Sequence, residues 1–166
     1  MLHGNPGWKE WNRPMALFTG TFENKVDRKG RVSLPADFRS ELSGDDARVI
    51  YIYPAPRHDR LDACDKAFMQ RLVESIEERP LYSDEEEDLS EIIVATARKT
   101  LMDETGRVVL PSDLAALVGI TDTAVFVGKG SRFQIWAPEA YPAYFKMVRE
   151  RGKDRTITLK PKGGAS

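Results

Sequence analysis

Residues 27–38 read DRKGRVSLPADF and residues 103–114 read DETGRVVLPSDL, so one short pattern occurs twice, 76 positions apart. The two copies share Asp, Gly, Arg, Val, Leu, Pro and a second Asp at matching positions. A spaced internal repeat predicts two related structural units in one chain. In a chain of 166 residues, each unit would have roughly 45 to 60 residues and would be marginal alone. We therefore expect the two units to share one core.

Each copy has the composition of a tight turn between two strands. Gly30 can adopt the positive φ that a tight reversal needs, and Asp27 can accept hydrogen bonds from backbone amides of the turn. Beyond the turn, Val32 and Leu34 alternate with Arg31 and a serine, which predicts a return strand with one buried face.

The segments on either side follow the same order in both halves. In the first half the patterns predict a strand at 18–26, a short helix at 36–42 with Pro35 in its first position, a strand at 48–53 and a helix at 66–78 that Pro80 ends. In the second half they predict a helix from Pro111 to Val118, strands at 123–127 and 132–136 around Gly128-Lys129-Gly130, and a last helix from Pro138. Each half reads strand, turn, strand, short helix, strand, strand, helix, which predicts an α+β fold.

Charge is distributed unevenly along the chain. The formal net charge is −1, but residues 74–91 hold nine acidic residues and one arginine. The remainder then has 24 Lys and Arg against 17 Asp and Glu. Ser83 and Glu86 form a capping box for a second linker helix over 84–94, and the acidic run DEEED fits its first turn better than a metal cluster. A protein with such separated charge can present a basic face to a polyanion.

Residue counts argue against several classes of function. With Cys64 as the one cysteine and His3 and His58 as the two histidines, an intrachain disulfide and a four-ligand Cys/His zinc site are excluded. Cys64 and His58 could be imagined as a nucleophile and its base, but a buried structural cysteine is the commoner case. No apolar run approaches the roughly 18 to 20 residues of a membrane span. We therefore expect no enzyme, no metal, no cofactor and no membrane contact.

The repeated arginine is the candidate functional residue. Turn geometry asks only for Asp and Gly, yet Arg31 and Arg107 follow at the same place in both copies. The plain alternative is an exposed ion pair across the turn. A carboxylate four residues earlier could instead hold the guanidinium in one rotamer, ready to donate paired hydrogen bonds to phosphate or guanine.

These residues carry a resemblance to a known family. The twice-used D-x-x-G-R-V-x-L-P motif, the helical linker, and ATARKTLMDETGRVVLP (95–111) followed by AVFVGKGSRFQIW (124–136) resemble the MraZ family of bacterial transcriptional regulators. The resemblance covers about residues 16–150. It implies two AbrB-like swapped-hairpin modules packed as one pseudo-symmetric unit, with a helical linker and a C-terminal helix.

The resemblance also implies a function and its residues. Family members bind double-stranded DNA upstream of the division and cell-wall gene cluster, including their own promoter, and assemble into rings of about eight or more subunits. Carried over, the DNA-binding residues are Asp27, Arg28, Lys29 and Arg31 in the first turn and Asp103 and Arg107 in the second. Because Glu104 and Thr105 replace the basic pair in the second turn, we expect the first copy to dominate DNA contact.

We expect the chain to divide into a leader at 1–14, module 1 at 18–68, a helical linker at 69–94, module 2 at 95–140, the end of a helix at 141–151 and a flexible basic tail at 152–166. The modules and the linker follow from the resemblance, whereas the leader and the tail lie outside it and are expected from their composition. The leader has no periodicity, which is typical of poor order, and Met15 is an alternative start. Residues 57–67 fit the family pattern less well than the turns do. A cytoplasmic, nucleoid-associated regulator is expected. The alternative is a swapped-hairpin module that binds another protein instead of DNA.

Overall fold

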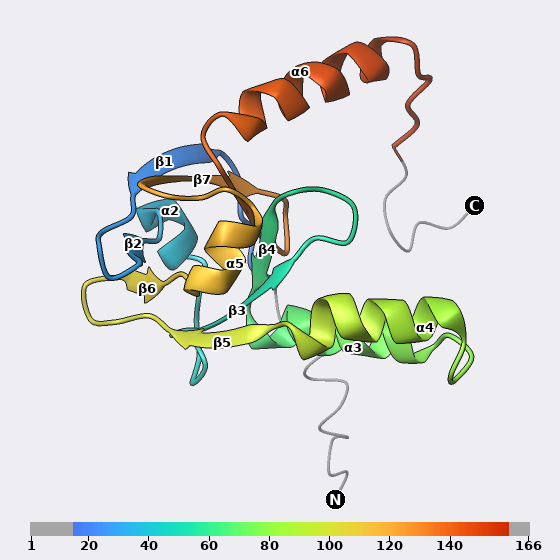
Figure 1. Ribbon diagram of the computed structural model, residues 1–166, viewed down its shortest axis with the longest axis horizontal. Coiled ribbons are helices and arrows are strands. Elements are labelled where there is room, and N and C mark those ends of the chain that lie inside the picture. The colour runs from blue at the N-terminus through green and yellow to red at the C-terminus, as the bar shows by residue number, and fades with distance from the viewer. Residues whose placement is uncertain (1–14, 160–166) are drawn as a thin grey trace, which may run out of the picture.

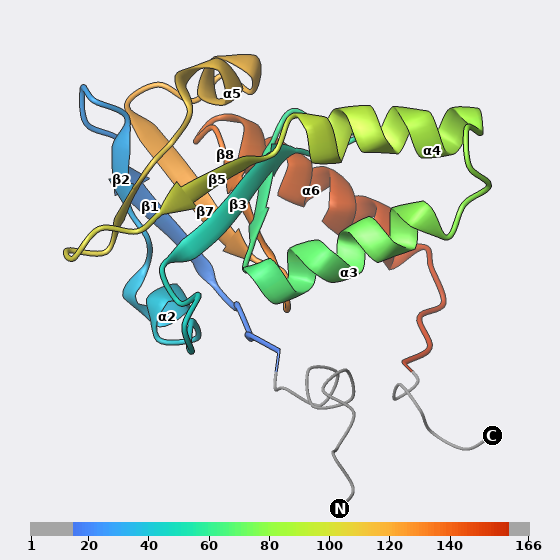
Figure 2. The ribbon, with the colours of Figure 1, turned by 90° about the horizontal axis from the view of Figure 1, so that it is seen from below.

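The computed structural model describes residues 15–159, and Figures 1 and 2 show it in two orientations. The leader expected at 1–14 and residues 160–166 of the expected tail lie outside the described residues. Within the described part, no helix is long and apolar enough to cross a membrane.

The two halves of the chain contain the same elements in the same order. The first half has β1 (Thr21–Lys25), β2 (Arg31–Ser33), α2 (Ala36–Arg39), β3 (Val49–Pro54), β4 (Leu61–Cys64) and α3 (Lys66–Glu77). The linker adds α4 (Asp84–Leu89) and a π-helical segment, η1 (Ser90–Ala95). The second half has β5 (Arg98–Leu101), β6 (Arg107–Val109), α5 (Ser112–Leu117), β7 (Thr123–Gly128), β8 (Phe133–Trp136) and α6 (Ala140–Lys153). The repeat predicted from the sequence is confirmed element by element.

The strands of the two halves interleave in one antiparallel sheet. Its order is β1-β7-β8-β4-β3-β5, so the edge strand of each half pairs with a strand of the other half. If each strand is replaced by its counterpart in the other half, the same order is obtained read backwards. This indicates a pseudo-twofold axis between β4 and β8. The predicted α+β class with exchanged hairpins is therefore confirmed.

A second, two-stranded sheet joins the repeated motifs directly. β2 and β6 pair antiparallel, with Val32 opposite Val108 at the centre. Beyond the ladder, Leu34 N–H donates to the carbonyl of Gly106 at 2.9 Å, and Leu110 N–H donates to the carbonyl of Gly30 at 2.8 Å. Each turn is thus tied to the strand that leaves the other turn.

One core serves both halves. Its fully buried aromatic side chains are Phe18, Phe38, Phe126 and Phe133, and the apolar residues of both motifs join them. The ring centroids of Phe18 and Phe133 lie 5.1 Å apart in an edge-to-face arrangement that aromatic pairs favour. The expectation of a shared core is confirmed, because neither half could enclose these side chains alone.

The α3–α4 hairpin and α6 lie outside this core. Asp65 caps α3, and Ser83 caps α4 by accepting the N–H of Glu86 at 3.3 Å, as the capping box predicted. The second linker helix ends near the predicted residue, although its last six residues are π-helical. In α6, Tyr141 and Tyr144 pack against Trp136, but no residue of the helix is buried. Figure 1 shows α6 running away from the sheet.

Four predicted helix boundaries were wrong by one to three residues. Pro35 and Pro111 each precede the helix as its N-cap, with extended ψ values of 139° and 128°, instead of occupying the first helical position. α2 ends at Arg39 instead of residue 42, because the next residues continue only as a turn. The last helix begins at Ala140 and not at Pro138.

Candidate nucleic-acid interface

The first turn is organised around the carboxylate of Asp27. Its Oδ1 accepts the backbone N–H groups of Lys29 and Arg31, both at 2.9 Å, and its Oδ2 accepts the Nε–H of Arg31 at 2.7 Å. Gly30 completes the reversal with φ at +79°, the left-handed region that glycine enters without strain. The one carboxylate therefore holds both the backbone of the turn and the side chain that leaves it.

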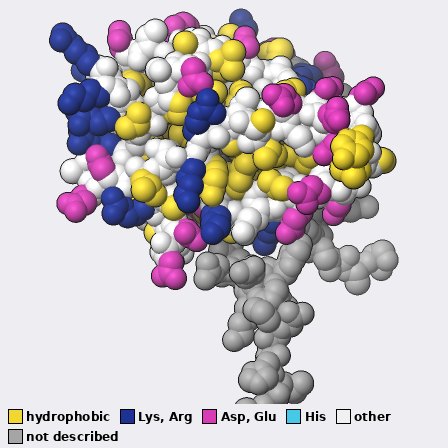
Figure 3. Space-filling model, turned by 60° about the horizontal axis from the view of Figure 1, so that its bottom comes forward, with side chains coloured by type: hydrophobic (Ala, Val, Ile, Leu, Met, Phe, Trp, Pro, Cys, Tyr) yellow, Lys and Arg dark blue, Asp and Glu magenta, His cyan; other side chains and the backbone are white. Residues whose placement is uncertain are grey.

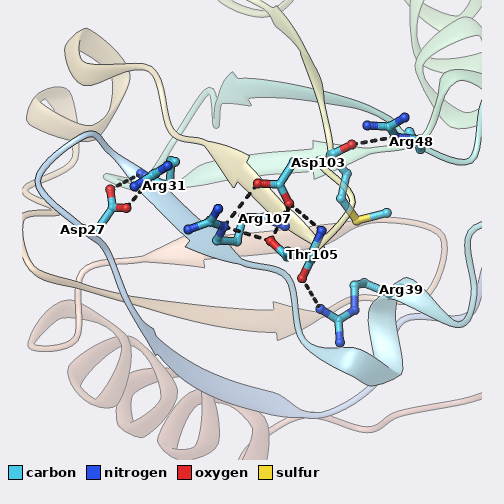
Figure 4. A network of polar contacts seen from close by, with 8 residues as sticks. Asp27, Arg31, Arg39, Arg48, Asp103, Thr105 and Arg107 are labelled. Carbon is cyan, nitrogen blue, oxygen red and sulfur yellow. Dashed lines mark hydrogen bonds and ion pairs between the residues drawn. The ribbon is translucent and has the colours of Figure 1, made fainter.

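The second turn repeats this geometry around Asp103. Its Oδ1 accepts the N–H of Thr105 at 2.9 Å and of Arg107 at 3.0 Å, and its Oδ2 accepts the Nε–H of Arg107 at 3.1 Å. The hydroxyl of Thr105 adds two further bonds, one to Asp103 and one from Arg107 Nε. Figure 4 shows both Asp–Arg pairs with these contacts. The predicted Asp–Arg pairing is thus observed in both copies.

In both pairs the aspartate accepts a hydrogen bond from the Nε–H of the guanidinium. In the described part of the chain, no hydrogen bond involves the terminal Nη groups of Arg31 or Arg107, and each side chain is 36% exposed. A guanidinium fixed through Nε presents its two Nη groups as a planar fork, the arrangement that donates two hydrogen bonds to phosphate or to the major-groove edge of guanine.

Hydrogen bonding keeps both aspartates ionised. The backbone N–H of Arg31, followed by the Arg31 side chain and the Lys29 N–H, lowers the pKa of Asp27 below its usual range. The backbone N–H of Arg107 and the hydroxyl of Thr105 lower the pKa of Asp103 still further. Both carboxylates are therefore charged at neutral pH, the state in which they accept these hydrogen bonds.

The two turns project from the same end of the molecule. Figures 1 and 2 both show the β1–β2 and β5–β6 connections at the end away from α3 and α4. In Figure 3, Lys and Arg side chains lie at this end and across the middle of the view with some Asp and Glu among them, whereas the other end carries mainly Asp and Glu. The charge separation read from the sequence therefore appears in space, with the exposed residues Arg28 and Lys29 in the first turn.

Two arginines that the sequence reasoning missed contact the second turn. Arg39 Nη1 donates to the carbonyl of Thr105 at 3.3 Å, and Arg48 Nε donates to the carbonyl of Met102 at 2.7 Å. Both come from the first half, 66 and 54 residues earlier in the chain. No local pattern could have shown them, because only the exchange of strands between halves brings them here.

The structure argues against chemistry at Cys64. The residue is fully buried beside Tyr53, and burial raises the pKa of its thiol. His58 packs its ring against Tyr144, with centroids 5.1 Å apart. A buried neutral thiol is a poor nucleophile, so Cys64 is a core residue as the commoner reading proposed.

The interleaved sheet and the joined turns define this chain as a protein of two swapped-hairpin modules. Residues 17–62 and 93–158 match the family described as "MraZ protein, putative antitoxin-like". The chain belongs to the MraZ family, as the resemblance indicated.

Relatives agree over most of the chain. A protein named transcriptional regulator MraZ from Parvibaculum lavamentivorans is 36% identical over 158 residues, which covers 90% of this chain and 98% of that protein. Its namesake from Rickettsia bellii is 35% identical over 147 residues, covering 88% and 98%. These relatives are named as regulators and not as enzymes. The solution structure of PHS018 from Pyrococcus horikoshii matches at a TM-score of 0.31 and 13% identity, covering 76% of this chain and 98% of that one, a likeness too low to bear on the fold.

Proposed function

We propose that this protein is a sequence-specific DNA-binding transcriptional regulator whose two turns read DNA through Arg31 and Arg107. The observation that carries the proposal is the same Asp–Arg pair built twice, in which each arginine is bound through Nε and its Nη groups make no hydrogen bond within the described residues. An ion pair that served only the turn would not require arginine at both sites, since the aspartate and glycine already make the reversal. The relatives' name, transcriptional regulator, supports the same role.

The contacts divide into two kinds. Arg28 and Lys29, both exposed in the first turn, would bind phosphate and supply affinity without sequence preference. Arg31 and Arg107 would contact base edges, for which a guanidinium held in one rotamer is well suited. Asp27 and Asp103 would act by positioning these arginines and not by touching DNA.

DNA from upstream of the protein's own gene is the natural first ligand. We propose that the target is the promoter of the division and cell-wall gene cluster, and that the protein works in the cytoplasm on the nucleoid. A fluorescence-anisotropy titration of the wild type against this duplex and a shuffled duplex, over a series of salt concentrations, tests the proposal. We expect preference for the upstream duplex and an affinity that falls steeply with salt, because bound phosphates release counterions.

Equal affinity for the two duplexes would contradict sequence-specific binding. Failure to bind either duplex at low salt would contradict DNA binding altogether. In that case the swapped-hairpin protein-interaction function becomes the better account.

We further propose that the protein acts as a ring-shaped homo-oligomer. α6 has no buried residue, and its large apolar side chains Phe145 and Met147 are about half exposed. Contact with a neighbouring subunit would cover these side chains, and a ring would present the turns at regular intervals so that weak contacts add. Light scattering coupled to size-exclusion chromatography should give a mass of several times 18.7 kDa; a mass of one subunit would contradict the ring.

A further inference from the structure

Arg39 lies directly over the second turn. A Cβ at position 106 would clash with Arg39 Nη1 and would lie 2.8 Å from Arg39 Cζ, so the guanidinium covers the glycine at close range. Gly106 is buried for this reason, whereas Gly30 of the first turn is half-buried and has only Leu110 O and Val109 near it. The second turn therefore has a guanidinium of the first half packed on its surface.

Arg48 contacts the same turn from its base. The backbone of Arg48 accepts the N–H of Met102 at 2.7 Å, and its side chain donates back to the Met102 carbonyl at 2.7 Å. Figure 4 shows Arg48 near Asp103 and Arg39 near Thr105. Arg48 is exposed, and each arginine uses one N–H for its carbonyl contact, leaving the rest of the guanidinium to bind elsewhere.

Within residues 15–159, no arginine of the other half contacts the first turn as Arg39 and Arg48 contact the second. Aligning the two motifs places Ala115 where Arg39 stands. The backbone of Asp122 accepts the N–H of Val26, as that of Arg48 accepts the N–H of Met102, so Asp122 takes the place of Arg48. At both positions, therefore, the backbone follows the pseudo-twofold symmetry but the charges of the equivalent side chains differ.

This asymmetry offsets the difference between the turns themselves. Residues 27–31 hold three basic side chains and one acidic one, a net charge of +2. Residues 103–107 hold one basic and two acidic side chains, a net charge of −1. With Arg39 and Arg48 added, the second site has a net charge of +1.

We propose that Arg39 and Arg48 are phosphate-binding residues that make the second turn a full DNA contact, in place of the basic pair that Glu104 and Thr105 displace. The inference rests on the proposed DNA-binding function and deepens it. It also predicts that the first turn does not dominate, contrary to what the local sequence alone suggested. Phosphate contacts fix position and add affinity, so the two arginines should affect both specific and non-specific DNA equally.

The test uses the full-length protein and the two duplexes described above. Binding is measured against salt for the wild type, Arg39→Gln, Arg48→Gln, the double Gln variant and Arg39→Lys. The matched control is Arg57→Gln/Lys129→Gln, which removes the same charge from the exposed β3–β4 and β7–β8 loops. Thermal unfolding of each variant is recorded alongside.

Each Gln variant should lower the slope of log K against log salt by about one, and the double variant by about two, with the preference between duplexes kept. Arg39→Lys should keep the wild-type slope, because it keeps the charge, and the control should bind like the wild type.

Two results would overturn the inference. A double variant with the wild-type slope would show that the arginines touch no phosphate. Loss of duplex preference in both Arg39→Gln and Arg39→Lys, with a lowered unfolding temperature, would show that Arg39 only shapes the turn. Both results require a wild type that binds DNA; if it binds neither duplex, the proposed function itself fails.

Discussion

At the scale of single residues, two aspartates organise the repeated motifs, and each makes two kinds of contact. Asp27 and Asp103 accept the amides that close their turns with one oxygen and orient an arginine with the other. The sequence could predict this unit because all of its parts lie within five residues. Arg39 and Arg48 could not be predicted, since they reach the second turn only through pairing between the halves.

The ionised carboxylate of Asp103 should make stability sensitive to acid. Its pKa is lowered in the folded protein, so its contribution is fully present above the unfolded value of 3.8 and is lost as pH falls through the folded value. Asp103→Asn should therefore lower the free energy of unfolding near neutral pH, and the difference from wild type should shrink in strong acid. Urea unfolding at a series of pH values from about 7 down to about 2 measures this, and a difference that grows on acidification would contradict the assigned contacts.

At the scale of elements, close approach of two backbone segments limits which side chains a strand position can hold. At the end of β7 the chain passes against the segment before β1, where Phe18 N–H donates to the carbonyl of Gly130 at 2.7 Å. A Cβ at Gly128 would lie 2.5 Å from the backbone carbonyl of Phe18. Sequence patterns predicted the strands on both sides, but they could not predict this contact between distant segments. They also could not predict which strands pair, because a period of two marks a buried face without naming a partner.

Gly128→Ala should accordingly be much more destabilising than a glycine substitution in open space. The backbone would have to move and disturb the packing of Phe18, at a cost of about 3 kcal/mol. Gly119→Ala is the matched control, because Gly119 has φ at +74° but nothing within 4 Å. We expect about 1 to 2 kcal/mol for Gly119→Ala, from left-handed strain alone. Chemical denaturation of both variants measures the comparison, and equal losses would show that the crossing does not constrain the fold.

At the scale of the whole molecule, neither half is a domain by itself. β1 is paired along its length with β7, and β5 with β3, so each half leaves an edge strand without its partner when the other is removed. The repeat allowed the sequence to predict two units with one core. The interleaved strand order required the three-dimensional structure, because it arises from long-range contacts between similar segments.

Separate halves should therefore fail to fold as monomers. Fragments 15–78 and 79–159 should each lack cooperative unfolding as monomers, and mixing them in equal amounts should restore the native circular dichroism spectrum. A cooperative unfolding transition in one monomeric fragment would contradict the shared core.

The measurement that tests the central claim most directly is DNA binding by Arg31→Gln/Arg107→Gln, beside the wild type and the charge-matched Arg57→Gln/Lys129→Gln control. Anisotropy titrations use upstream and shuffled duplexes at two salt concentrations, and circular dichroism confirms that each variant is folded. If the two turns read bases, the double variant should lose the preference for the upstream duplex, about 10- to 100-fold or more, while the control keeps it. A folded double variant that still prefers the upstream duplex as the wild type does would contradict the account.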